Sequence, residues 1–283
     1  MSSRLVKQSV YLTAASLTAA SVLYYSTSRR KPKRKMLPTY EATFSVPITC
    51  ESCTEEISRV LSELPGIQET SYSISSKLVT AKGTEPPSNI IAAIQSTGRA
   101  AILRGTGKAN SAAVCILETP PPAVAPPTPP SSPVRGLVRL IELADRITML
   151  DMTLTGMQEG KYKASIRRTG DISRGKDKMG DTFTGLEGDK KGEIGEIIVD
   201  AKGKGNLIGE IGWNVWEMVG RGVLVERSDH ERNATELTKE PDHFVVGVIA
   251  RSAGIWENEK MVCSCTGKTV WEEREQMVGK GML

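Results

Sequence analysis

The 283-residue chain is poor in three residue types that limit its chemistry: aromatics make up 5%, and there are only two histidines and five cysteines. His230 and His243 have no second histidine at ligand spacing, so we interpret both as loop residues rather than a metal centre. Five cysteines, four of them in tight pairs, do not fit the disulfide framework of a secreted domain. They indicate thiols kept for metal or redox work in a reducing or redox-controlled compartment.

Acidic residues are absent before Glu41, where all eight charged side chains are basic. Residues 8–28 carry no charge, and the run RRKPKRK follows them at 29–35. This composition fits a weak membrane anchor, a mitochondrial presequence or an extension with no targeting role, so we exclude residues 1–38 from the fold. Without those eight charges the formal charge falls from +4 to −4, so the rest of the chain shows no nucleic-acid footprint.

Residues 39–107 predict a compact α+β domain. YEATFSV at 40–46 alternates like a strand, and TEEISRVLSEL at 54–64 places its apolar residues on one helical face. Two short strands, a second helix with Ser88 as N-cap and Gly98 as terminator, and a last strand follow. The order βαββαβ is typical of a ferredoxin-like sandwich, with two helices on one four-stranded antiparallel sheet.

Residues 108–254 predict an all-β domain, because short apolar runs alternate with glycine-rich turns at regular spacing. The proline-rich segment 119–133 resembles a linker, but a clear strand, AAVCILE, precedes it. We therefore expect it to join the first two strands of one antiparallel sandwich or barrel. The tail, 255–283, shows no strand pattern, and its short amphipathic stretch at 270–277 is too small to bury a core of its own.

Cys50 and Cys53 lie where the first strand meets the first helix. The free N–H groups and positive dipole end of a helix N-terminus favour thiolate over thiol. Two thiolates without histidine or carboxylate suit Cu(I), whereas structural zinc needs four ligands. The alternative, a thioredoxin-like CxxC, belongs to a different order of strands and helices.

Cys263 and Cys265 form a second pair, two positions apart. Such residues point the same way in an extended segment, so their sulfurs can share one soft ion. A disulfide in so small a ring would be strained and active in exchange. The alternative is two incidental surface cysteines. Cys115, on an apolar alternating strand, is expected to be a buried structural cysteine.

Residues 38–274 resemble the fungal copper chaperones for Cu,Zn superoxide dismutase, through TCESC at 49–53, GVIARSAGIWEN at 247–258 and CSCTGKTVWEER at 263–274. The resemblance implies a heavy-metal-associated domain, a superoxide-dismutase-like β-barrel and a flexible CxC tail. It implies a metallochaperone that binds Cu(I) through both cysteine pairs and turns over no small molecule. The tail cysteines would deliver copper to Cu,Zn superoxide dismutase, in a heterodimer, and promote its disulfide.

The barrel departs from the dismutase pattern that it resembles. Ser165, Arg167 and Glu226 stand at copper-ligand places, and Val246 stands where the enzyme has a disulfide cysteine. The resemblance thus implies a barrel without a metal site that mimics the enzyme's partner subunit. The implied interface includes residues 219–221 and 249–254, and the same face would allow a homodimer through the barrel.

Two other functions stay open from the sequence. One is an active superoxide dismutase with a fused metal-uptake domain, against which the missing histidines count. The other is a copper carrier to a membrane copper ATPase, which would leave the barrel and tail without a purpose. We expect a cytoplasmic protein, or one that is also mitochondrial, in the intermembrane space, or tethered to a membrane, with membrane contact only through residues 1–38.

Overall fold

The computed structural model describes residues 38–120, 134–185, 192–228, 244–255, 257 and 267–279. All of them fall in the second of two compact units, Pro38–Leu283. Within these ranges no helix is long and apolar enough to cross a membrane. The segment interpreted above as an anchor or presequence lies outside the described residues.

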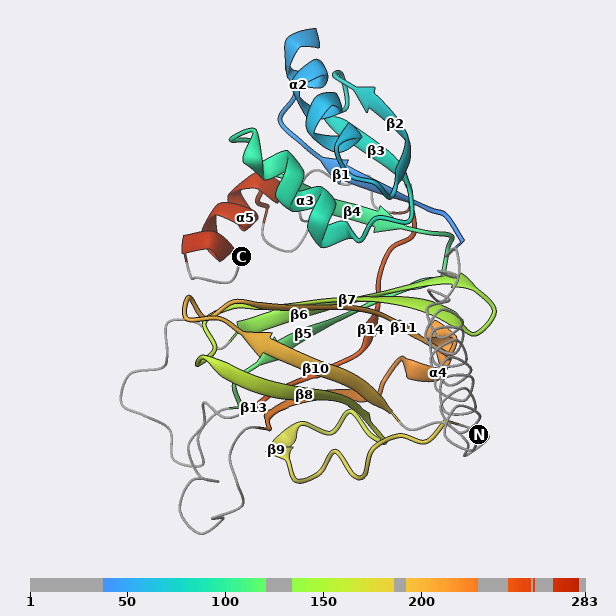
Figure 1. The fold of residues 1–283 in the computed structure, drawn as a ribbon, viewed down its shortest axis with the longest axis vertical. Coiled ribbons are helices and arrows are strands. Elements are labelled where there is room, and N and C mark those ends of the chain that lie inside the picture. The colour runs from blue at the N-terminus through green and yellow to red at the C-terminus, as the bar shows by residue number, and fades with distance from the viewer. Residues whose placement is uncertain are drawn as a thin grey trace, which may run out of the picture. The chain divides into compact units, whose positions relative to one another are not determined.

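The first domain is a βαββαβ sandwich (Figure 1). Its elements are β1 Tyr40–Ser45, α2 Glu51–Ser62, β2 Ile67–Ser73, β3 Leu78–Gly83, α3 Pro87–Ser96 and β4 Ile102–Thr106. The strands form one antiparallel sheet in the order β2-β3-β1-β4. Phe44 of the sheet and Ile57, Leu61, Ile90 and Ile94 of the helices are almost completely buried, which places the core between them. The ferredoxin-like prediction is confirmed.

The start of α3 corrects one detail of that prediction. Ser88 is not the N-cap: the helix begins at Pro87, with Pro86 at the N-cap position and no side-chain cap within the helix. Proline suits the first turn because the N–H that it lacks has no partner inside a helix. Gly98, with φ +77°, follows the last turn as predicted, in the left-handed conformation that favours glycine.

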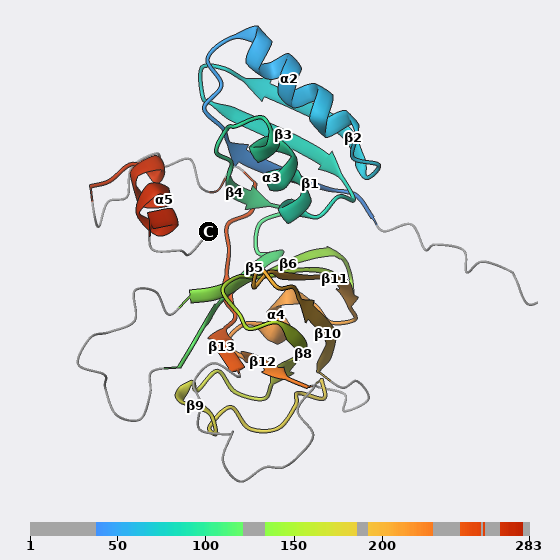
Figure 2. The ribbon, with the colours of Figure 1, turned by 60° about the vertical axis from the view of Figure 1, so that its left-hand side comes forward.

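The second domain is a nearly closed antiparallel β-barrel, whose curl is visible in Figure 2. Its strands are β5 Ala112–Glu118, β6 Val134–Ala144, β7 Ile147–Leu154, β8 Gly160–Arg167, β9 Ser173–Lys176, β10 Glu193–Val199, β11 Gly205–Ile211, β12 Gly222–Arg227, β13 Phe244–Val248 and β14 Ala250–Arg251. The hydrogen-bonded order is β10-β8-β12-β13-β5-β6-β7-β11, and β14 pairs with β5. Leu117, Leu140, Leu150 and Tyr162 fill the interior.

The proline-rich segment connects two strands that pair directly with each other. β5 and β6 form an antiparallel pair from Ala112–Ile141 to Glu118–Val134, and the segment 119–133 runs between them in sequence. It therefore joins neighbouring strands of one sheet, as expected, rather than two domains.

Three elements were missing from the sequence interpretation: β9, β11 and α4 (Val215–Met218). A fourth, α5 (Val270–Gly279), covers the stretch at 270–277 that was predicted to be amphipathic. In β11, Gly205 and Gly209 interrupt the alternation of side chains by which a strand is recognised. The start of α5 is a capping box: the Thr269 hydroxyl accepts a bond from the Glu272 N–H at 3.2 Å, and the Glu272 carboxylate accepts one from the Thr269 N–H at 2.7 Å. This signature was readable in the sequence TVWE.

Candidate metal-binding site

Cys50 and Cys53 lie together at the N-terminus of α2. Cys50 is the N-cap residue, in an extended conformation, and Cys53 is the third residue of the helix. Their Sγ atoms are 3.1 Å apart and both thiols are free. Because a disulfide is about 2.05 Å long, the pair is unbonded yet close enough for one soft ion to contact both sulfurs. Cys50 is exposed and Cys53 is 8% exposed, so the pair opens to solvent on one side.

The surroundings of Cys53 favour its thiolate. A hydrogen bond from the Thr49 backbone, followed by bonds from the side chains of Cys50, Arg99 and Thr49, lowers the pKa of Cys53 from 9.0 to about 6. A thiolate at neutral pH is a ligand for soft metal ions without further loss of a proton. These donors lie before α2 and on Arg99, so the lowered pKa has causes other than the free N–H groups and the dipole on which the sequence prediction relied.

Arg99 is a member of this site that the sequence analysis missed. Its Nη1 donates to the Glu56 carboxylate of α2 at 2.6 Å and to the Thr97 carbonyl at 3.2 Å. Hydrogen bonds to Glu56 and to Cys53, in that order, raise the pKa of Arg99. The guanidinium is therefore held as a cation beside Cys53, where it stabilises the thiolate of that residue. A basic residue directly after Gly98 was the available signal, but its approach to α2 is a long-range contact.

The remaining cysteines and histidines separate into two groups. Cys115 is completely buried in the barrel, and burial raises the pKa of its thiol to about 12, which fits the structural role predicted for it. Cys263, Cys265, His230 and His243 lie outside the described residues. Among the residues that the structure describes, no cluster of three or more His, Cys, Asp or Glu side chains is placed to hold a metal ion.

The three predicted ligand places of the barrel lie on the paired strands β8 and β12. Glu226 accepts a bond from Lys176 Nζ at 3.1 Å, and the same ammonium lies 5.3 Å from the centroid of the Phe244 ring. Arg167 donates to the Thr182 hydroxyl at 3.3 Å, and Ser165 pairs with Leu224 across the two strands. These positions offer one carboxylate with a basic neighbour, not a set of converging ligands.

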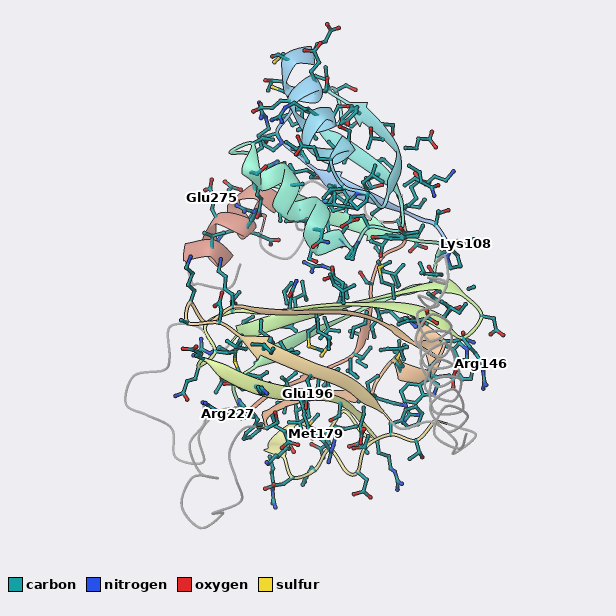
Figure 3. The ribbon with its side chains drawn as sticks, in the orientation of Figure 1. Lys108, Arg146, Met179, Glu196, Arg227 and Glu275 are labelled. Carbon is teal, nitrogen blue, oxygen red and sulfur yellow. The ribbon has the colours of Figure 1, made fainter. Side chains whose placement is uncertain are left out.

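An apolar cluster fills the space beside that ion pair. Met179, Leu224 and Val246 are at most 2% exposed, and Ile172 and Phe244 pack against them. Met179 is labelled in Figure 3, on the segment between β9 and β10. Side chains of the barrel itself thus cover this part of the outer face of β12 and β13. Val246, which was predicted to stand at the place of the enzyme's cysteine, belongs to this cluster.

The expected docking segment 219–221 is partly committed to internal contacts. The Arg221 guanidinium lies 3.6 Å from the centroid of the Phe183 ring and donates to the Glu217 carbonyl at 2.6 Å. Phe183 in turn packs against the buried Trp213, with ring centroids 4.9 Å apart. Trp216, on α4, is 59% exposed and is the large apolar side chain that this region presents to solvent.

Comparisons with known proteins agree with the geometry. The family described as "Heavy-metal-associated domain" matches residues 43–100, which include both thiols of the first pair. The "Superoxide dismutase 1 copper chaperone" of Debaryomyces hansenii is 38% identical over 263 residues, covering 87% of this chain and 99% of that protein. The protein of the same name from Saccharomyces cerevisiae is 36% identical, covering 86% and 98%.

Similarity extends to more distant species. The "Copper chaperone for superoxide dismutase" of Sus scrofa is 30% identical, covering 84% of this chain and 90% of that protein. A solved structure, "The apo form of HMA domain of copper chaperone for superoxide dismutase", is similar at 26% identity and a TM-score of 0.25, over 28% of this chain and 80% of that one.

Proposed function

Because the chain belongs to the family of copper chaperones for superoxide dismutase, we propose that it binds copper and delivers it to a superoxide dismutase. It is a metallochaperone, with copper as cargo, and it turns over no small molecule. The observation that carries the proposal is the Cys50–Cys53 pair, with sulfurs 3.1 Å apart and a Cys53 pKa of about 6.

The cargo is Cu(I). Two sulfur ligands, without histidine or carboxylate in the pair, suit a soft ion of low coordination number. Arg99 adds a positive charge that offsets the net negative charge of two thiolates around one Cu(I) ion. Thr49 and Arg99 supply hydrogen bonds to the Cys53 sulfur before copper arrives. The first domain, residues 39–107, therefore acquires copper.

The barrel, residues 108–254, is a docking domain that forms a heterodimer with Cu,Zn superoxide dismutase. A barrel of the client's own kind can use the face by which the client pairs with itself. The internal contacts of Glu226 with Lys176 and of Val246 in an apolar cluster support a barrel that has no metal centre. The same observation argues against the alternative, an active superoxide dismutase with a fused metal-uptake domain.

The tail, residues 255–283, acts on the client through Cys263 and Cys265. These residues transfer copper and exchange a disulfide: the bond between the two tail sulfurs opens, and one forms between two client thiols. The client loses two electrons and two protons, and the tail pair gains them. A tethered tail reaches the client at high effective concentration once the barrel has docked. We place this reaction in the cytoplasm and, if residues 1–38 direct it there, in the mitochondrial intermembrane space.

The proposal is tested with two double variants, Cys50→Ser with Cys53→Ser and Cys263→Ser with Cys265→Ser, mixed with copper-free, reduced Cu,Zn superoxide dismutase. Heterodimer formation, client disulfide and client activity are measured at scarce and at excess copper. We expect both variants to dock. The first should fail only when copper is scarce, and the second should fail at both copper levels.

Two results would contradict the assignments. If excess copper rescues the tail variant as well as the first-domain variant, the tail is only another copper carrier. If the purified wild-type protein shows dismutase activity of its own, the enzyme alternative holds.

A further inference from the structure

The first turn of α3 receives its cap from the barrel. The Ser88 N–H donates to Asp151 Oδ2 of β7 at 2.8 Å. Within α3 there is no side-chain cap and no acidic residue in the first turn. A carboxylate at this place satisfies a free N–H group and complements the positive end of the helix dipole. Asp151, 63 residues away in sequence, thus performs the task that Ser88 was expected to perform.

Asp151 is a buried charge whose balance depends on both domains. Its strand neighbours Leu150 and Met152 face the barrel core, so Asp151 projects from the outer face, yet it is 0% exposed. Arg139 is its register partner on β6, with Nη1 3.5 Å from Oδ2. Burial lowers the pKa of Arg139, and Asp151 acts in the opposite direction. The Ser88 N–H is the contribution of the first domain to this pair.

The charge of Asp151 also affects Tyr40 in β1, the first strand of the sandwich. The Tyr40 hydroxyl donates to the Glu85 carbonyl, just before α3. Burial, then the negative charges of Asp151 and Glu85, raise the pKa of Tyr40 well above its usual value. The ionisable groups whose pKa Asp151 shifts are therefore Arg139 and Tyr40, and the Glu85 carboxylate accepts bonds from Gly66 and Asn89.

A second attachment lies at the end of β4. The Thr106 N–H donates to the Ala253 carbonyl at 3.3 Å, and the Ile255 N–H donates to the Gly107 carbonyl at 3.2 Å. Here two glycines bring the backbones together, because a Cβ on Gly105 would lie 2.1 Å from the Gly254 carbonyl oxygen. The first domain therefore contacts the barrel through the start of α3 as well as through the end of β4.

We propose that Asp151 is a positioning residue: as the cap of α3 and the partner of Arg139, it fixes the copper domain on the outer face of β6 and β7, so that the two domains move as one body. Such a buried pair fixes orientation more than it adds stability, since desolvation offsets much of its attraction. Resting on the proposed function, one consequence is that Cys50 and Cys53 do not swing to the client, which leaves delivery to the tail.

The test uses the full-length, reduced, copper-free protein and two readouts that do not depend on delivery. Rotational correlation times of the two domains come from NMR relaxation, and amide hydrogen exchange is followed at residues 88–90. We expect one common correlation time in the wild type. In Asp151→Asn we expect exchange of the Ser88 amide to rise at least tenfold and the first domain to tumble faster than the barrel.

Two further variants keep the test decisive. Arg139→Leu with Asp151→Leu removes the buried charges together, so the barrel keeps its fold while the cap is lost; the same rise in Ser88 exchange is expected. Glu63→Gln disrupts an exposed ion pair on α2 with Arg59 and should change neither readout. Two correlation times in the wild type, or unchanged Ser88 exchange in both Asp151 variants, would overturn the proposal. Neither result would affect the copper-delivery assignment, which is measured on the client.

Discussion

The two domains differ at the positions where the sequence suggested metal ligands: the sandwich presents free thiols, and the barrel is filled by packing and an ion pair. In the sandwich, Cys50 and Cys53 stand unpaired at a helix N-terminus, with hydrogen-bond donors aimed at sulfur. In the barrel, Glu226 is paired with Lys176 and the space beside it is filled by Met179 and Leu224. The difference illustrates how a few side chains decide whether a place in a fold presents candidate ligands or is filled by packing.

Removing the thiols should abolish metal binding completely. In a variant with Ser at positions 50, 53, 263 and 265, we expect copper and zinc in the full-length protein to fall to background after dialysis, because the described residues of the barrel offer no ligand cluster. The measurement is metal analysis of the purified protein, and Cys115→Ala, which leaves all four thiols, should retain copper. Stoichiometric copper or zinc in the fourfold variant would show that the barrel is a metal site.

The two buried thiols should differ greatly in reactivity. With a pKa of about 6, Cys53 is deprotonated as the pH rises through 6, so its alkylation rate should be half-maximal near pH 6 and constant above about pH 7. With a pKa of about 12, Cys115 stays protonated throughout this range. At pH 7 their thiolate populations differ by a factor on the order of 10⁵.

The check is iodoacetamide labelling of the reduced, copper-free protein, with each cysteine followed by peptide mass spectrometry. Cys115 should be labelled only when denaturant unfolds the barrel. Labelling of Cys115 at a rate near that of Cys53 in the native protein would contradict the burial on which its role depends.

Near Glu226 of the barrel, apolar packing should contribute more to the free energy of unfolding than the ion pair does. Met179 is fully buried, so Met179→Ala should lower the free energy of unfolding by about 2–4 kcal/mol through lost burial and a cavity. Glu226 and Lys176 are each 40% exposed, so Glu226→Gln should cost about 0.5 kcal/mol. Denaturant unfolding of both variants ranks the two effects, and a larger loss in Glu226→Gln would reverse this interpretation.

Features that depend on neighbouring residues were predicted from the sequence, whereas features that depend on long-range contacts were missed. The βαββαβ order and the thiol pair at the start of α2 follow from local alternation and helix signals. Arg99 and Lys176 were not identified, because each acquires its role from a partner brought close by the fold: Glu56 is 43 residues away and Glu226 is 50 away. Ser88 was assigned as a cap on local grounds, and the actual cap is a carboxylate from another domain.

Arg99 should have a modest effect on the reactivity of Cys53. Arg99→Met removes both a cation and a hydrogen-bond donor beside Cys53, so the pKa of Cys53 should rise from about 6 towards its ordinary value. Because less thiolate is then present at pH 6.5, alkylation of Cys53 should slow several-fold at that pH, and the rates should converge above the raised pKa.

Arg59→Met is the matched control, since that arginine is 67% exposed and pairs with Glu63 on the same domain. If Arg59→Met slows the reaction as much as Arg99→Met does, the effect comes from the net charge of the domain rather than from the Arg99 contact. Arg99→Lys separates charge from geometry: if the cation alone matters, it should restore most of the rate, and if the planar hydrogen bonds to Cys53 and Glu56 matter, it should restore little.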